Sequence, residues 1–263
     1  MSWVWGEVAI DTVQVEVTRD CNLQCPGCLR TLRNQLGRWS NDQMRIDLFE
    51  RVLTNLPTCR VLILNGTGEP MLNPDLAAIV RRAKDSGKFQ GLTFNSNGLA
   101  RGIDGYLEVA RAGLSFLSIS VDSLTQDVAD KVRAGTKVEK LSARIKELAQ
   151  ALPIPLTITS VVCRENLFDI GETLAKLNDL GRFTVFLTDW SDVALLDFLE
   201  PMGRQLDAKE RLLLSNLVEK LRPQVPNLEL VLTLPEQRSQ ENRCPAPFRH
   251  PFIDAEGFVT PCC

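Results

Sequence analysis

The stretch Cys21-Asn22-Leu23-Gln24-Cys25-Pro26-Gly27-Cys28 places three thiols close together, directly after a run of alternating apolar and polar residues. Thiolates favour soft metals and iron–sulfur clusters, and clustered cysteines in a chain without an export signal are more often metal ligands than disulfide partners. A four-iron cluster bound by four cysteines is saturated, whereas three cysteines leave one iron open to another ligand. The stretch therefore predicts a 4Fe-4S cluster with one reactive iron, held by Cys21, Cys25 and Cys28.

Two alternatives stay open for these thiols: a structural zinc knuckle, and three unrelated thiols on a surface loop. Zinc normally takes a fourth Cys or His ligand nearby. The only histidine of the chain is His250, far along the sequence. The iron–sulfur interpretation is therefore favoured over both.

Composition narrows the class of protein. A chain of 263 residues suggests one large domain, or one domain and a small appendage, and 44 % apolar with 24 % charged residues is ordinary for a globular protein. The net charge of -3 argues against a nucleic acid partner. No long apolar run and no secretory signal pattern occur, so we expect no membrane partner. Eight cysteines without an export signal predict a cytoplasmic location.

The periodicity of the chain alternates between strands and helices. A strand at 12–17, a helix at 41–56 and an apolar strand at 61–64 form a first βαβ unit. The same pattern predicts further strands at 91–95, 115–121, 156–162 and 183–187, with helices at 74–86, 104–112, 126–132, 138–152 and 167–180. Six strands joined by helices predict an α/β fold with a parallel sheet, in the form of an open or partial (β/α)6 barrel.

Reactive groups in such folds gather at the carboxyl ends of the strands. Three of these ends are informative: Asn65-Gly66-Thr67-Gly68-Glu69-Pro70, Asn95-Ser96-Asn97-Gly98 and Ser118-Ile119-Ser120-Val121-Asp122. Glycines allow the backbone to approach a ligand closely. An ordinary turn is an equal alternative for Asn97 and Gly98, because both residue types tolerate the left-handed conformation.

The Cys-x3-Cys-x2-Cys spacing resembles the signature of the radical S-adenosylmethionine (SAM) superfamily. The three strand ends are similar to the Gly-Gly-Glu-Pro, Ser-Asn-Gly and Ser-Ile-Asp elements of that family, in the same order. The resemblance implies that SAM chelates the open iron. It also implies that the reduced cluster cleaves SAM to methionine and a 5'-deoxyadenosyl radical, with flavodoxin or ferredoxin as electron donor.

The resemblance also implies roles for single residues. The amino group of SAM would be held by the backbone oxygens and carboxylate of the second strand end, the ribose by Ser120 and the carboxylate by Arg133. The implied SAM-binding residues are Gly27, Gly66, Thr67, Gly68, Glu69, Asn95, Ser96, Ser120 and Arg133. Gly27 departs from the family, which usually carries an aromatic there, and Thr67 stands in place of a glycine. A solvated arginine at a helix end is the alternative for Arg133.

The sixth strand ends in Thr188-Asp189-Trp190. A dehydrogenating enzyme needs a base near its substrate, and Asp189 is the candidate catalytic residue. An ordinary capping aspartate is an equally good interpretation. Cys59 and Cys163 flank strands and are interpreted as small buried apolar residues, although Cys163 could reach the cavity.

The last part of the chain carries a second group of cysteines. Cys244, Gly257 and Cys262 match the opening half of the SPASM pattern, Cys-x(9-15)-Gly-x4-Cys, around a predicted hairpin at 253–259. The resemblance implies an auxiliary 4Fe-4S cluster with Cys244, Cys262 and Cys263 as ligands. The later cysteines of the pattern are missing, because the sequence stops on Cys263, and a hairpin with unligated thiols is an equal alternative.

We therefore expect a radical SAM core over residues 1–199. Residues 200–263 would form a linker helix at 207–221, a strand at 228–234 and a partial SPASM/Twitch element. The expected activity is hydrogen-atom abstraction from a peptide or small-metabolite substrate, in peptide maturation or dehydrogenation. Two alternatives are a glycyl-radical activating enzyme and a non-catalytic iron–sulfur carrier or scaffold. Formation of 5'-deoxyadenosine would distinguish an enzyme from a carrier.

Overall fold

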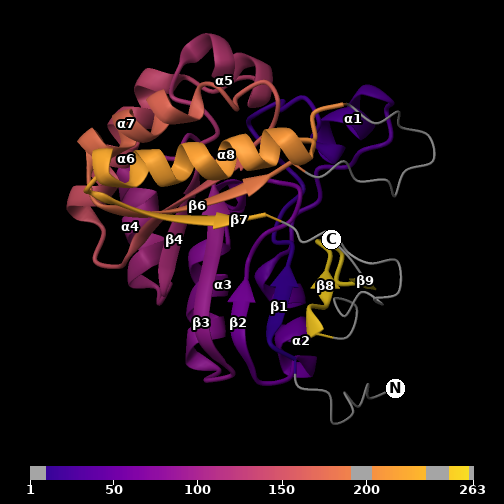
Figure 1. The fold of residues 1–263 in the computed structure, drawn as a ribbon. Coiled ribbons are helices and arrows are strands. Elements are labelled where there is room, and N and C mark those ends of the chain that lie inside the picture. Colours follow the sequence, from indigo (N-terminus) through magenta and orange to yellow (C-terminus); the bar gives the residue numbers. More distant parts are fainter. Residues whose placement is uncertain (1–9, 191–202, 235–248, 261–263) are drawn as a thin grey trace.

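The sheet contains nine strands in the described part of the chain, in the spatial order β7-β6-β5-β4-β3-β2-β1-β8-β9. The computed structural model describes residues 10–190, 203–234 and 249–260 (Figure 1). Strands β1 to β7 run parallel to one another, and only β8 and β9 pair antiparallel. Their bounds are β1 Thr12–Val15, β2 Cys59–Ile63, β3 Phe89–Ser96, β4 Phe116–Ser120, β5 Leu156–Val162, β6 Phe183–Asp189, β7 Leu228–Thr233, β8 Phe252–Ile253 and β9 Val259–Thr260.

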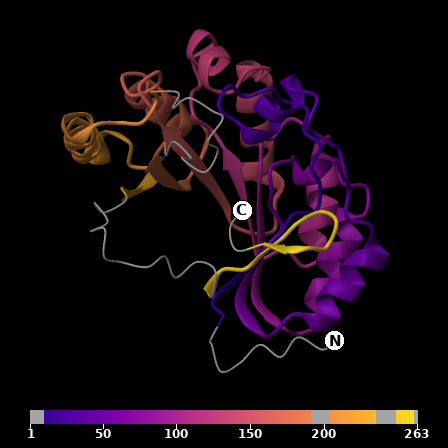
Figure 2. The same ribbon diagram turned by 90° about the vertical axis from the view of Figure 1, so that its right-hand side faces the viewer.

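The longer helices form one layer on the outer side of the curved sheet (Figure 2). Neighbours along the chain pack together, α2 on α3, α3 on α4, α4 on α6, α6 on α7 and α7 on α8. The helices are α1 Leu29–Gln35, α2 Ile46–Asn55, α3 Leu76–Asp85, α4 Ile103–Arg111, α5 Gln126–Val132, α6 Val138–Ala151, α7 Ile170–Leu180 and α8 Ala208–Leu221, with short 3-10 turns η1 Pro70–Leu72 and η2 Arg222–Gln224. This arrangement is a partial (β/α) barrel, as the sequence predicts.

Each central strand has two different faces, because side chains alternate along a strand. One face packs on the helices and forms the main apolar core, as Leu117 and Ile119 of β4 do. The opposite, concave face carries hydroxyl groups and few charges. On β4 to β6 the concave face consists of Phe116, Ser118, Ser120, Thr157, Thr159, Val161, Thr184, Phe186 and Thr188.

The hairpin of β8 and β9 joins the sheet beside the first strand. β8 runs parallel to β1, with Gln14 opposite Phe252. Gln14 N donates to Pro251 O at 3.0 Å, and Glu16 N donates to Ile253 O at 2.8 Å. Two segments far apart in the sequence therefore lie side by side, and the hairpin covers the open edge of β1.

Two loops at the carboxyl edge of the sheet hold the residues of interest. The cysteine loop, residues 20–28, follows β1 and leads into α1. The glycine-rich loop, residues 65–69, follows β2 and leads into η1. Both leave neighbouring parallel strands, so they lie next to each other.

The sequence predicts every longer strand and helix of this fold to within a few residues. It misses α1 and the pairing of the hairpin with β1. The strand predicted at 228–234 is β7, which extends the same sheet next to β6. The boundary expected at 199 falls outside the described residues. No helix in the described part of the chain is both long enough and apolar enough to cross a membrane.

Candidate cofactor site

The loops at the carboxyl edge of the sheet are hydrogen-bonded to one another. Glu69 N donates to Asp20 O at 2.7 Å, which joins the glycine-rich loop to the cysteine loop. Asn97, which follows β3, donates through Nδ2 to Asn22 Oδ1 at 2.7 Å. The structure therefore brings together three of the segments that the sequence singles out.

The three thiols of the cysteine loop are half-buried. Cys28 lies at the start of α1, and its N–H donates to Cys25 O at 3.2 Å. Leu23 N donates to Cys21 Sγ at 3.5 Å. Hydrogen bonds to sulfur tune iron–sulfur centres, so this donor is directed where a cluster ligand would use it.

The pKa values of two thiols are raised. Burial raises the pKa of Cys25 to about 11; Arg133 acts in the opposite direction, and the neighbouring Cys28 and Cys21 raise it further. Burial also raises the pKa of Cys21. These thiols are therefore protonated at neutral pH without metal, and iron binding must displace their protons. Cys28 raises the pKa of both Cys21 and Cys25, which agrees with three sulfurs in one region of the loop.

The donor set suits a cluster better than a single ion. In the residues that the structure describes, no three His, Cys, Asp or Glu side chains are grouped so as to hold one metal ion. A 4Fe-4S cluster has a different requirement, because each thiolate binds a different iron atom. Cys21, Cys25 and Cys28 are the residues that would hold it.

A buried arginine supports the cysteine loop. Arg30 donates through Nε to Arg19 O at 3.2 Å and through Nη1 to Leu23 O at 3.1 Å. Within the loop, Gly27 has a φ of 85°, in the left-handed region. An aromatic residue would be strained at this φ, so the departure from the family pattern agrees with the backbone conformation.

The glycine-rich loop fits only without side chains at two positions. A Cβ on Gly68 would lie 2.3 Å from Thr18 O, and a Cβ on Gly66 would lie 2.2 Å from the side chain of Glu16. Thr67 donates to Glu16 Oε1 through its N–H at 2.8 Å and through Oγ1 at 2.7 Å. Close contact with the segment after β1 therefore fixes the path of this loop.

Glu69 is buried, and its carboxylate points into the protein. Oε1 accepts hydrogen bonds from Met71 N at 3.1 Å and Ser96 Oγ at 2.8 Å, and Oε2 accepts one from Asn97 N at 2.6 Å. Burial raises the pKa of Glu69, and these donors oppose the increase. The carboxylate is thus engaged by donors of the protein, and its contact with the SAM amino group stays a prediction.

The end of β3 presents its two predicted residues to opposite sides. Asn95 is exposed on the concave face, and its backbone is held by Asn65, which accepts from Asn95 N at 2.7 Å and donates to Asn95 O at 3.1 Å. Ser96 is buried on the helix side, where its hydroxyl lies 3.0 Å from Tyr106 Oη and also bonds Glu69. Ser96 therefore supports Glu69 from behind.

Ser120 is the last residue of β4, and Arg133 follows helix α5. Ser120 is half-buried on the concave face, where a ribose could reach it. Arg133 Nη1 donates to Asp122 Oδ2 at 3.2 Å, and Asp122 Oδ1 accepts from Val161 N at 2.8 Å. Burial would lower the pKa of Arg133, but Asp122, Cys25 and Cys21 together outweigh this effect and raise it. Arg133 is thus partly engaged, and its binding of the SAM carboxylate stays a prediction.

Asp189 lies on the helix side of β6. It shares that side with Val185 and Leu187, and its Oδ2 accepts from Arg211 Nε of α8 at 2.6 Å. Its side chain is 1 % exposed, and Oδ1 has no hydrogen-bond partner among the described residues. This geometry favours a structural ion pair, and the assignment of Asp189 as a base stays a prediction that its orientation does not support.

The remaining five cysteines fall into two groups: two lie in the described part of the chain, and three do not. Cys59 and Cys163 are buried, as expected for small apolar residues. Burial also raises the pKa of Cys163 to about 12, so this thiol stays protonated. Cys244, Cys262 and Cys263 lie outside the described residues.

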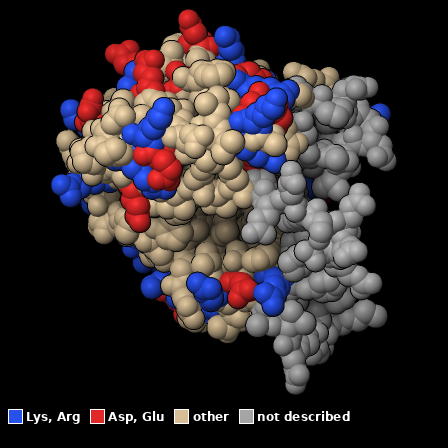
Figure 3. Space-filling view, viewed as in Figure 1, with Lys and Arg blue, Asp and Glu red and all other residues tan. Residues whose placement is uncertain are grey.

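A recess opens on the concave side of the sheet. Figure 3 shows it below β7 in the view of Figure 1, with walls that carry neither blue nor red atoms. Phe186, at 41 % exposed, is the most exposed apolar residue of the concave face as defined above. The recess therefore offers an uncharged surface on this side of the sheet.

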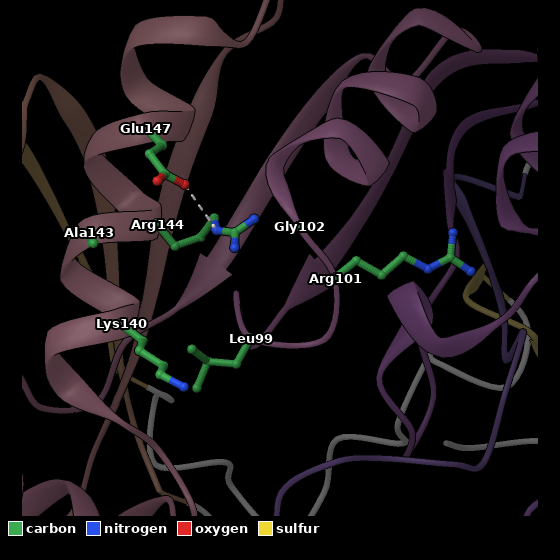
Figure 4. Close-up of a pocket in the computed structure, with 7 residues that line it drawn as sticks. All are labelled: Leu99, Arg101, Gly102, Lys140, Ala143, Arg144 and Glu147. Carbon is green, nitrogen blue, oxygen red and sulfur yellow. Dashed lines mark ion pairs between the residues drawn. The ribbon is translucent and has the colours of Figure 1, made fainter.

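A second cavity, of about 400 Å³, lies between the start of α4 and α6. Figure 4 shows Arg101 pointing away from Arg144 and Lys140, and Arg101 Nη2 donates to Asn73 O at 2.8 Å. Arg144 forms an ion pair with Glu147 at 3.4 Å. Two of the three cations are thus already engaged, which leaves this cavity a weak candidate for a site.

Sequence reasoning missed the groups that connect the loops. Glu16 and Arg19 form an ion pair at 3.0 Å, and Glu16 is buried although it stands at a polar position of a predicted strand. Arg30 follows Cys28 in a segment that no pattern marks. The Glu16 and Arg19 spacing of three residues is the only local signal for this group.

The fold and this site are those of a radical SAM protein, and comparison with known sequences agrees. The sequence model of the radical SAM superfamily matches residues 15–177. The chain belongs to this superfamily. Its cofactors are accordingly a 4Fe-4S cluster and SAM, and auxiliary clusters are typical of its SPASM-type relatives.

Several curated relatives are similar over most of the chain. A PqqA peptide cyclase of Bradyrhizobium diazoefficiens is 28 % identical over 259 residues, covering 95 % of this chain and 66 % of that protein. A PqqA peptide cyclase of Rhodopseudomonas palustris is 33 % identical, covering 66 % of this chain and 45 % of that protein. The mycofactocin maturase MftC of Mycobacterium ulcerans is 27 % identical, covering 75 % and 49 %. The chain thus spans from about half to two thirds of these relatives.

Solved structures share the fold. Streptococcus suis SuiB bound to SAM aligns with a TM-score of 0.75 at 14 % identity, covering 97 % of this chain and 60 % of SuiB. The protein anSMEcpe with bound AdoMet aligns with a TM-score of 0.70 at 14 % identity, covering 95 % of this chain and 74 % of that one. Identities this low support the architecture alone.

Proposed function

We propose that this chain is the core of a radical SAM enzyme that abstracts a hydrogen atom from a peptide during its maturation. The observation that supports this most is the convergence of the cysteine loop, the glycine-rich loop and the open concave face at one edge of the sheet. The PqqA peptide cyclases are named for a peptide substrate. SuiB has been crystallised with the precursor peptide SuiA. A peptide is therefore favoured over a small metabolite.

Each group of residues at the carboxyl edge of the sheet would bind a different part of the cofactors. Cys21, Cys25 and Cys28 would bind three irons of the cluster, and the fourth iron would take SAM. When reduced, the cluster supplies the electron that cleaves SAM to methionine and a 5'-deoxyadenosyl radical. The glycine-rich loop would hold the amino group of SAM through its backbone, and Ser120 its ribose.

The concave face would hold the substrate. It lies directly beside these loops, so a reacting carbon placed there would be within reach of the radical. Its hydroxyl groups suit the N–H and C=O groups of a peptide backbone, and Phe186 offers an apolar contact. An auxiliary cluster on the residues beyond 234 would accept the second electron or anchor the substrate.

Cleavage of SAM tests the enzyme class. The protein is reconstituted with iron and sulfide without oxygen, and is then given dithionite and SAM. We expect 5'-deoxyadenosine by chromatography, and loss of both this product and the brown colour of the first cluster in Cys25→Ala. Cys59→Ala is the matched control, because Cys59 is buried on β2 away from the site. A fully loaded three-cysteine cluster that gives no 5'-deoxyadenosine would support a carrier or scaffold instead.

The substrate is tested separately. Short peptides encoded beside the gene are incubated with the active enzyme and SAM, and their masses are measured. A peptide that loses hydrogen in proportion to the 5'-deoxyadenosine formed supports maturation. Turnover of small metabolites but of none of these peptides would contradict it, and a radical installed on a partner protein would indicate a glycyl-radical activating enzyme.

A further inference from the structure

Arg19 stands between the C-terminal hairpin and the cysteine loop, and one guanidinium group contacts four carboxylates. Its Nε lies 3.0 Å from Glu16, its Nη1 lies 3.2 Å from Asp42 and 3.0 Å from Glu256, and its Nη2 lies 3.0 Å from Asp254. Burial would lower the pKa of Arg19, but its hydrogen bonds to Glu16 and Glu256 outweigh this effect and raise it. The side chain of Arg19 is 17 % exposed, and Glu16 and Asp254 are also shielded from solvent, whereas Asp42 and Glu256 lie at the rim of the network.

Two of the four carboxylates belong to the turn of the hairpin. Asp254 Oδ1 accepts hydrogen bonds from Glu256 N at 3.0 Å and Phe258 N at 2.9 Å, which fixes the turn, while its Oδ2 binds Arg19. Gly257 in the same turn has a φ of 89°, and a Cβ there would lie 3.1 Å from Leu48. The hairpin is therefore seated through its turn as well as through its backbone pairing with β1.

The backbone of Arg19 holds the cysteine loop from the other side. Arg19 O accepts hydrogen bonds from Arg30 Nε and from Trp39 Nε1, each at 3.2 Å. Arg19 N donates to Asp42 O at 2.8 Å. Because Asp20 and Cys21 follow directly, any shift of Arg19 moves the start of the cysteine loop.

The same network reaches the glycine-rich loop. Glu16 binds Arg19 through Oε2 and Thr67 through Oε1. Its Oε2 also lies 3.4 Å from Ala255 N of the hairpin. Glu16 and Arg19 together therefore touch the hairpin and both loops of the cofactor site.

We propose that Arg19 is a positioning residue through which the seated hairpin holds the cysteine loop in its cluster-binding shape. On this view the hairpin supports the first cluster mechanically, whether or not the region around it carries ligands for a second cluster. The inference rests on the chain's membership of the radical SAM superfamily and not on the choice of substrate.

The test separates mechanical support from ligation. A background variant with Cys244→Ala, Cys262→Ala and Cys263→Ala leaves Cys21, Cys25 and Cys28 as the ligands for any cluster. Two variants are made in this background. One carries Asp254→Asn together with Glu256→Gln, and the other carries Arg19→Lys. Asn keeps an oxygen for the turn at Asp254, and Lys keeps the charge of Arg19 without its fork geometry. Arg45→Met is the control, because Arg45 is exposed and pairs only at 3.5 Å with Asp47.

The first readout is hydrogen exchange of the cluster-free protein. In the variant with Asp254→Asn and Glu256→Gln, we expect the amides of residues 20–28 and of residues 250–260 to exchange about tenfold faster than in the background variant. In Arg19→Lys, the exchange rates of both segments should fall between those of these two proteins. Arg45→Met should leave both segments unchanged. Faster exchange confined to 250–260 would overturn the proposal.

The second readout is spectroscopic. With the cluster loaded and reduced, we expect the electron paramagnetic resonance signal to be broader in the variants and to change less when SAM is added. We also expect iron to be lost faster to a chelator. Each effect should be largest in the double variant and smaller in Arg19→Lys. Unchanged spectra and iron loss would contradict the proposal even if the parent forms 5'-deoxyadenosine. If amides of α7 and α8 also exchange faster in the double variant, the whole fold has been destabilised. The single variant Glu256→Gln is then compared instead, because Glu256 is half exposed and its replacement should disturb the fold less.

Discussion

At the scale of single residues, the glycine-rich loop depends on hydrogen bonds made inside the protein. Glu69 accepts three hydrogen bonds inside the protein, and Ser96 supports it with Tyr106 behind. A buried carboxylate with three donors is a rigid element, because losing any donor would leave a charge poorly compensated. The path of the glycine-rich loop is therefore set from the core side.

Gly68→Ala tests how closely this loop must pack. The added Cβ would meet backbone oxygens at 2.3 Å and 2.6 Å, and neither Thr18 nor Asp20 can move away without shifting the cysteine loop. We expect SAM affinity to fall at least about tenfold, and the protein to lose about 1–3 kcal/mol of stability, as for other overpacked sites. Equilibrium dialysis with SAM and urea unfolding measure the two effects.

Gly171→Ala is the control for that substitution. A Cβ on Gly171, in the first turn of α7, would make an ordinary contact of 3.7 Å with Leu221. Replacing a helical glycine there should leave SAM binding unchanged and stabilise the protein by about 0.5–1 kcal/mol. Equal SAM affinity in both variants would contradict the packing argument.

Arg211→Met tests whether Asp189 has a structural role. Removing the guanidinium leaves the carboxylate of Asp189 buried without its partner, which we expect to cost about 3 kcal/mol in the free energy of unfolding. Adding Asp189→Asn should restore part of this loss, because the uncompensated charge disappears. Urea unfolding of the two single variants and the double variant measures the coupling.

The base hypothesis for Asp189 predicts a different pattern. A catalytic base would make Asp189→Asn lose product while still cleaving SAM, and Arg211→Met would keep full stability. That outcome would show that the carboxylate turns toward the substrate during turnover.

Single residues were predictable where their chemistry repeats in a short pattern. The spacing of Cys21, Cys25 and Cys28 marks a cluster without any structural information. The alternation of Val185 and Leu187 could also have shown that Asp189 faces the helices. Its partner Arg211 lies 22 residues away in the sequence, and no local rule connects the two.

At the scale of elements, helix α8 begins with a complete cap. Asp207 accepts from Lys209 N at 2.8 Å and Glu210 N at 2.9 Å, while Glu210 reaches back to Asp207 N. These bonds lower the pKa of Asp207, that from Glu210 N most, so the carboxylate is stabilised in its charged form. Its contribution to stability is present above the unfolded pKa of about 4 and is lost as pH falls through the lower folded pKa.

Asp207→Asn should therefore matter less in acid than at neutral pH. Asn can still cap the helix but does not titrate, so the stability difference between wild type and variant should shrink as the pH is lowered from 7 to 3. Urea unfolding at both pH values measures this difference, and other acidic groups affect both proteins alike. A difference that grows in acid would contradict the capping role.

Elements with strong periodicity were predictable, and their long-range partners were not. The strands and the longer helices follow from apolar alternation and from helical repeats. Helix α1 has seven residues with only two apolar side chains, Leu29 and Leu32, which is too few to show a period. The hairpin shows turn residues in its sequence, but nothing local indicates that it pairs with β1.

At the scale of the whole molecule, the concave face is open and uncharged at its centre. Phe186→Ala should lower kcat/KM for the peptide substrate about tenfold, because an aromatic contact with a ligand contributes about 1–2 kcal/mol. SAM cleavage without substrate should stay unchanged, since Phe186 lies away from the cysteine loop on β6. Steady-state kinetics with the identified peptide measures the effect.

Phe168→Ala is the matched control, because Phe168 is 84 % exposed and precedes α7. Its kcat/KM should equal that of the wild type. If both phenylalanine variants lose activity equally, the substrate does not use the concave face. If neither does, the contact with Phe186 is absent.

The pairing of β8 with β1 has a consequence for the newly made protein. At about 5–20 residues per second, a ribosome needs roughly 10–50 s to travel from the first of these strands to the second. During that interval one side of β1 has unsatisfied backbone groups, and Arg19 lacks its partners Asp254 and Glu256. An iron–sulfur assembly factor that meets the chain in this period would find an accessible but unfinished binding loop.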